Sequence, residues 1–437
     1  MLRTPRLAAF ALALAACATL PSLSPGQAAA SQRAARPSST RLGFSVDRLA
    51  RIDSFYQRAV DSGKMAGAVV LVMRDGQTVY ERAFGWADKE AGRRMTTDAV
   101  FRIASQTKAL TSVAIMSLVE EGKVGLDEPV SHFIPAFERT TVAARTDTGR
   151  VIVPARRQVT IRDLLTHTAG ISYGTDSLVA PLYAAQGLGP AAGYGWYTAD
   201  KNEPICETME RLATLPFVAQ PGERFVYGYN TDILGCVVER ASGVPLDEFI
   251  RARITAPLGM RDTHFFLPPE QRARLTAVYT SRATGAPVER APDGPRGQGD
   301  YVDGPRRSFA GGAGLLSTAR DYARFLQMLL NGGALEGVRV LGPKTVQLMA
   351  TNQTGMLFSA DGEGFGLGFR VLERAGARGR PESVGTFGWG GAYGSEYEVD
   401  PKEGLVLVFM TQELPNRNLL GTRLPMLVYQ ALVEPRR

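Results

Sequence analysis

The residues Ser105-Gln106-Thr107-Lys108 decide how the rest of this 437-residue chain is interpreted. They precede a stretch from Ala109 to Glu120 in which apolar residues recur at helical spacing. Positions three apart lie on one face of a helix, so the Ser105 hydroxyl and the Lys108 amine can share a hydrogen bond. The helix N-terminus also favours negative charge near the serine oxygen. The pattern predicts an activated nucleophile, although the same residues also fit an ordinary helix start with a solvated lysine.

Composition indicates an ordinary globular protein. With 44% hydrophobic residues the chain can bury a large core, and its length fits one two-lobed catalytic unit or two domains. The formal net charge of +7 falls to +5 without residues 1–30, because Arg3 and Arg6 are the only charges there. The sequence has no basic run or basic patch interleaved with aromatic residues. We therefore expect no nucleic-acid partner.

Residues 1–30 are predicted to be an export signal. Arg3 and Arg6 precede an apolar stretch from Leu7 to Leu20, which is too short for a membrane-spanning helix. Two cleavage sites compete: the segment ending in Cys17 resembles the bacterial lipoprotein box, and Ala28-Ala29-Ala30 resembles a signal-peptidase site. Residues 31–45, rich in Ser, Arg and Pro, are predicted to be a flexible tether. We expect an exported protein, either periplasmic or secreted, or a lipoprotein anchored to the membrane through Cys17.

Export leaves the two remaining cysteines free to pair. Cys206 and Cys236 can form a disulfide in an oxidising compartment. Both lie in segments with helical patterns, and the sequence favours reading them as small buried hydrophobic residues.

The distribution of strands predicts the fold. A helix is expected over 46–62 and a hairpin over 68–81, and strands reappear at 366–371, 386–389, 396–399 and 405–411, with mostly helix between. Strand clusters at both ends of the chain are most simply joined in one antiparallel sheet. The predicted class is therefore α/β (α+β): a sheet lobe (46–100 and 310–433) flanked by helices, with an inserted helical lobe (105–305). The stretch 291–307, rich in Gly, Pro and Arg, is predicted to be a mobile loop beside the site.

Several further segments carry a family resemblance. They are Phe101-Arg102-Ile103-Ala104-Ser105, the 164–170 segment Leu-Leu-Thr-His-Thr-Ala-Gly, the 221–235 segment that contains Tyr227, Pro257-Leu258-Gly259-Met260, the 311–318 segment Gly-Gly-Ala-Gly-Leu-Leu-Ser-Thr, and Gly388-Trp389-Gly390-Gly391. Together they resemble the serine beta-lactamase and penicillin-binding-protein-like family, in its class C-like branch. The resemblance covers residues 46–433, predicted to form one beta-lactamase-like serine hydrolase domain.

The resemblance implies a role for each matching residue. Ser105 would be the nucleophile, Lys108 the partner that keeps it activated, and Tyr227 the base that takes and returns the proton. The backbone N–H groups of Ser105 and Ala392 would stabilise the oxyanion of the tetrahedral intermediate. Trp389, Gly390 and Gly391 would bind substrate.

Two departures from the lactamase pattern point to one branch of the family. The lactamase tyrosine motif has asparagine two positions after the tyrosine, whereas here that position is Tyr229 and the asparagine is Asn230. Tyr229 is therefore a second, weaker candidate for the catalytic base. The third motif usually begins with Lys or His, whereas here it begins with Trp389. Both features resemble family VIII carboxylesterases.

Other possible sites are weaker. Gly170-Ile171-Ser172-Tyr173-Gly174 matches the nucleophile elbow of α/β-hydrolases, but the elbow requires a preceding strand and residues 160–168 have a helical pattern. His167 is predicted to be a structural hydrogen-bonding residue near the site, and His132 and His264 to be surface or turn residues. Three scattered histidines suggest no metal site, and no cofactor is expected.

The sequence therefore predicts a serine hydrolase that forms an acyl-enzyme, acting as a carboxylesterase on short acyl chains. The alternatives on the same machinery are a beta-lactamase, a D-amino-acid amidase or peptidase, and an acyltransferase. A non-catalytic penicillin-binding sensor is a further alternative, against which the retained Tyr227 argues. The expected partner is a small-molecule ester or amide, and the sequence gives no oligomeric state.

Overall fold

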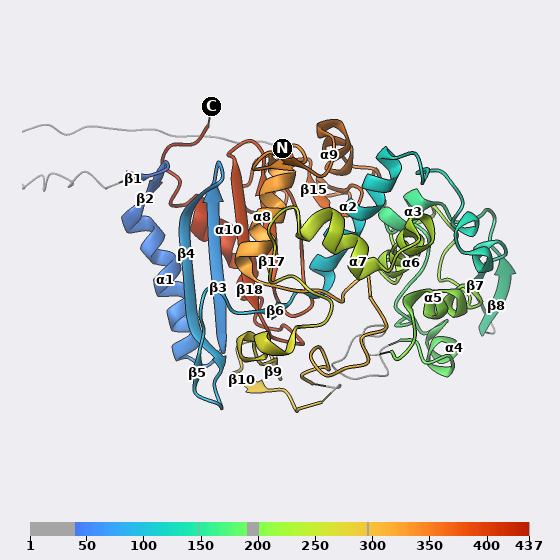
Figure 1. The fold of residues 1–437 in the computed structure, drawn as a ribbon, viewed down its shortest axis with the longest axis horizontal. Helices are drawn as coiled ribbons and strands as arrows, with labels where there is room; N and C mark the ends of the chain where they lie inside the picture. Colours follow the sequence, from blue (N-terminus) through green and yellow to red (C-terminus); the bar gives the residue numbers. More distant parts are fainter. Residues whose placement is uncertain (1–39, 148, 190–200, 295–296, 437) are drawn as a thin grey trace, which may run out of the picture. The chain divides into compact units, whose positions relative to one another are not determined.

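An eight-stranded antiparallel sheet forms the framework of the fold (Figure 1). The computed structural model describes residues 40–147, 149–189, 201–294 and 297–436. The strands lie in the order β14 (Glu363–Phe365), β15 (Arg370–Leu372), β16 (Phe387–Gly390), β17 (Glu396–Asp400), β18 (Leu405–Thr411), β3 (Gly67–Arg74), β4 (Gln77–Asp88) and β5 (Arg93–Arg94). The expected hairpin is β3–β4, and β3 pairs with β18 in a register that runs from Ala68↔Thr411 to Arg74↔Leu405. Strands from both ends of the chain thus meet in mid-sheet, as predicted.

Helices cover both faces of the sheet, and alternation along β3 assigns its side chains to each face. Ala68, Val70 and Val72 pack with residues of α1 (Val46–Asp61) and α10 (Leu424–Tyr429). Val69 and Leu71 point the other way and join the larger core, which contains α2 (Thr107–Glu120) and α8 (Ala319–Leu330). A strand whose successive side chains are apolar on both faces is expected in a sheet buried on both sides. The predicted α/β class, with an antiparallel sheet between helices, is confirmed.

The middle of the chain is mainly helical and irregular. Its helices are α3 (Ile161–Leu165), α4 (Ala180–Ala185), α5 (Ile205–Ala213), α6 (Asn230–Ser242) and α7 (Leu246–Ile250), with α9 (Pro343–Met349) further on. Short helical turns are η1 (Ala104–Gln106), η2 (Val130–His132), η3 (Pro135–Phe137), η5 (Arg251–Thr255), η6 (Pro269–Arg274) and η7 (Leu420–Arg423). The two-stranded pairs are β1–β2 (Thr40–Arg41, Phe44–Ser45), β6–β11 (Phe101–Arg102, Leu316–Ser317), β7–β8 (Thr141–Thr146, Gly149–Pro154), β9–β10 (Tyr279–Ser281, Val288–Arg290) and β12–β13 (Ala334–Leu335, Val338–Arg339).

Some local predictions were wrong. The β7–β8 and β9–β10 hairpins interrupt the stretch expected to be helical. The predicted strand 366–371 is mainly the turn between β14 and β15, in which the Gly366 N–H donates to the Phe369 carbonyl at 2.7 Å. The described residues of 291–307, by contrast, form a loop as predicted, and the Gln298 side chain bonds both the N–H and the carbonyl of Val278. Residues 295–296 lie outside the described part.

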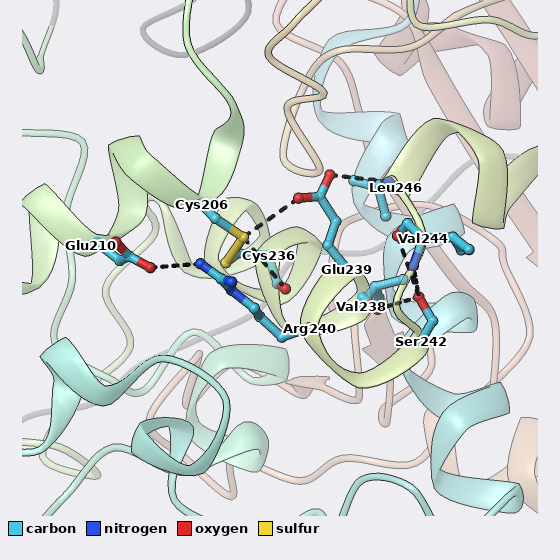
Figure 2. Close-up of a disulfide and its surroundings, with 9 residues drawn as sticks. All are labelled: Cys206, Glu210, Cys236, Val238, Glu239, Arg240, Ser242, Val244 and Leu246. Carbon is cyan, nitrogen blue, oxygen red and sulfur yellow. Dashed lines mark hydrogen bonds and ion pairs between the residues drawn. A yellow bond between two sulfur atoms is a disulfide. The ribbon is translucent and has the colours of Figure 1, made fainter.

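The two cysteines are joined, which corrects the prediction that they are separate buried residues. Cys206 in α5 and Cys236 in α6 form a disulfide, with their Cα atoms 4.9 Å apart (Figure 2). The helical setting was correct, but two helices packed side by side can bring cysteines within bonding distance. The bond ties α5 to the helix that begins three residues after Tyr227.

The predicted signal and most of the predicted tether, residues 1–39, lie outside the described residues. Within the described ranges, no helix combines the length and apolar character required to cross a membrane.

Candidate active site

Ser105 lies in the turn between a short strand and the core helix α2. It is the second residue of η1, which follows β6, and its side chain is almost buried, with 8% of the residue exposed. Ala104 before it adopts a left-handed φ of 48°, a conformation that non-glycine residues seldom take. Such backbone strain is often found at functional sites. The turn begins α2, in line with the setting expected from the sequence.

Lys108 lies one turn along, with its amine inside the protein. Its Nζ donates to Ser105 Oγ at 3.3 Å, to the Tyr173 hydroxyl at 2.8 Å and to the Gly312 carbonyl at 2.6 Å. The residue is 3% exposed, so these oxygens take the place of water around the amine. A buried ammonium of this kind needs its three donors satisfied by nearby oxygens. The three acceptors fix the amine beside the serine oxygen.

Tyr173 and Gly312 were not predicted as partners of Lys108. Tyr173 lies in the 170–174 segment, which matches the nucleophile-elbow pattern through its serine. Gly312 is held by Asp232 Oδ1, which accepts from its N–H at 2.9 Å, and a Cβ at Gly312 would lie 2.4 Å from Asp232 Oδ2. The glycine therefore allows the close approach that aims its carbonyl at Lys108.

Tyr227 also lies against the lysine amine. Lys108 Nζ is 4.7 Å from the centre of the Tyr227 ring, and the Tyr227 Oη accepts a hydrogen bond from Trp389 Nε1 at 3.1 Å. The Tyr227 ring also packs against His167, with 4.7 Å between ring centres. The structure thus brings Tyr227 and Trp389, which lie far away in the sequence, next to the Ser105–Lys108 pair.

The segment of Tyr227 is fixed by a buried amide. Asn230 Nδ2 donates to His167 Nδ1 at 2.9 Å and lies 3.2 Å from the Val226 carbonyl. Burial and, secondarily, the nearby Lys108 ammonium hold the pKa of His167 well below its ordinary value, so the imidazole is neutral. His167 is therefore a hydrogen-bonding residue next to the site, in the position expected. Asn230, the asparagine displaced from the lactamase spacing, fixes this turn.

Tyr229 has its hydroxyl engaged by a backbone N–H and its ring in contact with Tyr173. It is 1% exposed, and its hydroxyl accepts from the Gly189 N–H at 3.1 Å. Its ring packs edge-on against Tyr173, with 5.0 Å between ring centres. Among the described tyrosines, only Tyr173 and Tyr227 have rings in cation–π contact with Lys108.

The turn after β16 lies against the start of η1. Trp389 and Gly390 end the strand, and Gly391 is so close to the Ile103 carbonyl that a Cβ there would lie 2.6 Å from its oxygen. Ala392 packs against the small apolar cluster that contains Ala104. Its N–H donates no hydrogen bond to any described residue, and the N–H of Ser105, at the second position of η1, has no partner within that turn. Two backbone donors are thus available near the serine.

The structure agrees with the readings of Ser172 and His132 but not with that of His264, which bridges to Leu316 and is not a surface or turn residue. Ser172 is buried and its hydroxyl accepts from the Gly174 N–H at 3.1 Å, and the element before it is the helix α3 and not a strand. His132 pairs with Glu128 at the surface, whereas His264 is half-buried. The residues that the structure describes contain no group of three or more His, Cys, Asp or Glu side chains arranged to hold a metal ion.

Comparison with known proteins agrees with this arrangement. The sequence profile of the family described as Beta-lactamase matches residues 52–427. Esterase EstB of Burkholderia gladioli is 35% identical over 387 residues, which cover 84% of this chain and 92% of EstB. The structure of EstCE1, described as a hydrolase with promiscuous acyltransferase activity, matches with a TM-score of 0.73 and 30% identity over 89% of this chain and 99% of that one. A mutant of simvastatin synthase (LovD) from Aspergillus terreus matches with a TM-score of 0.72 and 26% identity over 89% of this chain and 95% of that one. The resemblance drawn from the motifs is confirmed: the chain belongs to the beta-lactamase family and is similar to hydrolases with esterase activity.

Proposed function

We propose that this protein is a serine hydrolase that opens ester bonds through an acyl-enzyme, with one catalytic domain over residues 46–433. The observation that carries the proposal is the position of Lys108 Nζ, 3.3 Å from Ser105 Oγ and 4.7 Å from the centre of the Tyr227 ring. One buried ammonium contacts both the nucleophile and a phenol. A cation at this position stabilises the negative charge that develops on the serine oxygen or the phenol oxygen during the reaction.

In the proposed acylation, Ser105 Oγ attacks the ester carbonyl carbon and its proton passes to the Tyr227 oxygen. The oxyanion that forms is stabilised by the N–H groups of Ser105 and Ala392. Tyr227 then gives the proton to the leaving oxygen, the carbon–oxygen bond breaks, and the alcohol departs. In deacylation, water takes the place of the alcohol, Tyr227 removes its proton, and the acid is released as Ser105 regains a proton.

Trp389 supports neutral esters as the substrate class. It stands where related lactamases have a cationic side chain, and an indole offers an apolar wall and one N–H donor. That donor is already directed at Tyr227. A substrate carboxylate would lose its hydration here without gaining a cation, so we propose short-chain carboxylic esters over penicillins and cephalosporins.

Acyl transfer is the second candidate, because the EstCE1 structure is described as a hydrolase with promiscuous acyltransferase activity. The same acyl-enzyme would then be opened by an alcohol in place of water. Product analysis of an ester reaction run with added alcohol separates the two outcomes.

The decisive test compares two serines. Ser105→Ala is expected to lower turnover of p-nitrophenyl butyrate by about 10⁴-fold or more and to abolish labelling by a phosphonate, since members of a catalytic unit cause losses of that order. Ser172→Ala serves as the matched control and is expected to keep most of both. Phosphonate labelling at Ser172 would refute the assignment.

We also propose that the chain is exported. The Cys206–Cys236 disulfide supports an oxidising compartment and leaves Cys17 as the one cysteine without a partner cysteine in this sequence. Intact-mass measurement of the processed protein distinguishes a diacylglyceryl Cys17 from a free Ser31 terminus. A chain that retains Arg3 would contradict export.

A further inference from the structure

Four aromatic side chains form a continuous surface beside Tyr227. Ring centres are 4.9 Å apart for Phe225 and Phe358, 5.5 Å for Phe358 and Phe365, and 5.3 Å for Phe365 and Trp389. Phe358 also lies 6.2 Å from Trp389. Phe365 is buried, whereas the other three are half-buried. We call these four residues the aromatic surface.

The loop before Phe358 adds two apolar side chains that face solvent. Met356 is 80% exposed and Leu357 is 42% exposed. The loop is anchored just before them, because Asn352 Oδ1 accepts from the Thr354 N–H at 2.9 Å and Asn352 Nδ2 donates to Glu373 at 2.8 Å. Consecutive exposed apolar residues next to a half-buried aromatic group are typical of a binding surface.

The position of Tyr227, the proposed proton donor, indicates which part of the substrate lies next to the aromatic surface. In the proposed reaction, the leaving oxygen must come within about 3 Å of the Tyr227 Oη to receive its proton. Trp389 Nε1 is itself 3.1 Å from that Oη, so the first carbon atoms of the leaving alcohol lie next to the indole. Phe358 lies 6.2 Å from the indole, and the exposed Met356 and Leu357 directly precede it in the sequence.

We infer that the aromatic surface, with Met356 and Leu357, binds the alcohol side of the ester, and that the alcohol is bulky and apolar, such as an aryl or polycyclic alcohol. The inference rests on the proposed function, since it takes Tyr227 as the proton donor. Flat or fused rings gain most from such a surface, because aromatic groups pack in tilted and edge-on arrangements like those already present in it.

The test uses two esters of the same acid, 2-naphthyl acetate and ethyl acetate, so that both form the same acyl-enzyme. Phe358→Ala is expected to lower kcat/KM for 2-naphthyl acetate by about 10-fold, from lost apolar contact, and for ethyl acetate by less than about 2-fold. Phe55→Ala is the matched control, because Phe55 is also half-buried but belongs to α1 on the far face of the sheet. It is expected to leave the ratio of the two rates unchanged.

A second variant guards against misfolding. In Met356→Ser/Leu357→Ser the replaced side chains are exposed, and we expect about a 3-fold loss on the naphthyl ester alone. Met426→Ser, at an exposed residue of α10, is its control. Equal losses on both acetates, or a changed dependence on acyl length across ethyl acetate, butyrate and octanoate, would overturn the inference while leaving the esterase proposal intact. If the native chain hydrolyses none of these esters, the proposed function fails and this inference with it.

Discussion

Replacing Trp389 by phenylalanine tests whether the indole N–H acts on the proton-transfer step. The change keeps an aromatic ring at the end of β16 but removes the donor that lies 3.1 Å from Tyr227 Oη. When Tyr227 carries negative charge during the reaction, that hydrogen bond has a charged acceptor. Hydrogen bonds to charged groups are typically worth about 1.5–3 kcal/mol. The expected loss in kcat/KM is therefore about 10- to 150-fold.

The leaving group makes this prediction specific. p-Nitrophenol departs readily as an anion, whereas ethanol must be protonated as it leaves, so Trp389→Phe is expected to impair ethyl butyrate hydrolysis more than p-nitrophenyl butyrate hydrolysis. The assay measures kcat/KM for both esters in the native protein, in Trp389→Phe and in Trp86→Phe. Trp86 is a half-buried tryptophan on β4 that stacks on Arg94, so it controls for loss of an indole elsewhere. Rates within about 3-fold of native on both esters would refute a role for the indole N–H.

Three further predictions follow from the same site. Tyr227→Phe is expected to lower kcat for ester hydrolysis by orders of magnitude, and Tyr229→Phe by far less. Of these two rings, only that of Tyr227 lies against the Lys108 amine. A larger loss in Tyr229→Phe would make Tyr229 the base. The native protein is expected to have a kcat/KM for p-nitrophenyl butyrate about 100-fold or more above that for nitrocefin, roughly 2.7 kcal/mol. Trp389→Lys is expected to reduce this ratio. An unchanged ratio would mean that Trp389 does not select the substrate class. Burial keeps His167 neutral in the folded state, whereas in the unfolded chain this residue gains a proton below pH ~6.5. His167 is therefore expected to lower the free energy of unfolding by up to about 1.4 kcal/mol for each pH unit of acidification. Urea titrations between pH 7 and 5 measure the free energy of unfolding of the native protein and of His167→Gln, and the difference between the two gives the contribution of His167. A difference that does not change with pH would contradict the prediction.

The sequence predicted those parts of the fold in which local pattern and burial agree. β3 and β18 are continuous apolar runs, β17 alternates polar and apolar residues, and a tight turn joins β3 to β4, so these strands were predicted at nearly the right places, although β4 continues to Asp88. The β7–β8 hairpin was missed because β8 is largely exposed and has no apolar face to reveal its period. Glycines in 366–371 were included in a strand, although they form its turn.

The sequence predicted only those site residues that belong to recognisable motifs. Ser105 and Lys108 are three residues apart, so helix geometry alone brings them together. Tyr173 and the Gly312 carbonyl reach the lysine from loops distant in sequence, Asp232 of α6 holds Gly312, and no local pattern marks such contacts. The Cys206–Cys236 bond is of the same kind, because it depends on how α5 packs on α6 and not on either helix alone.

The pairing of β3 with β18 also sets the order in which the molecule can be completed. Roughly 330 residues separate Arg74 from Leu405, which a ribosome takes tens of seconds to synthesise at about 5–20 residues per second. Until β18 is made, β3 can pair in this sheet only with β4, so one edge of this apolar strand stays open. An open apolar edge pairs readily with other chains. Chains that end before Leu405 should therefore associate through β3, and the last sheet strand to be made is the one that protects the first hairpin from aggregation.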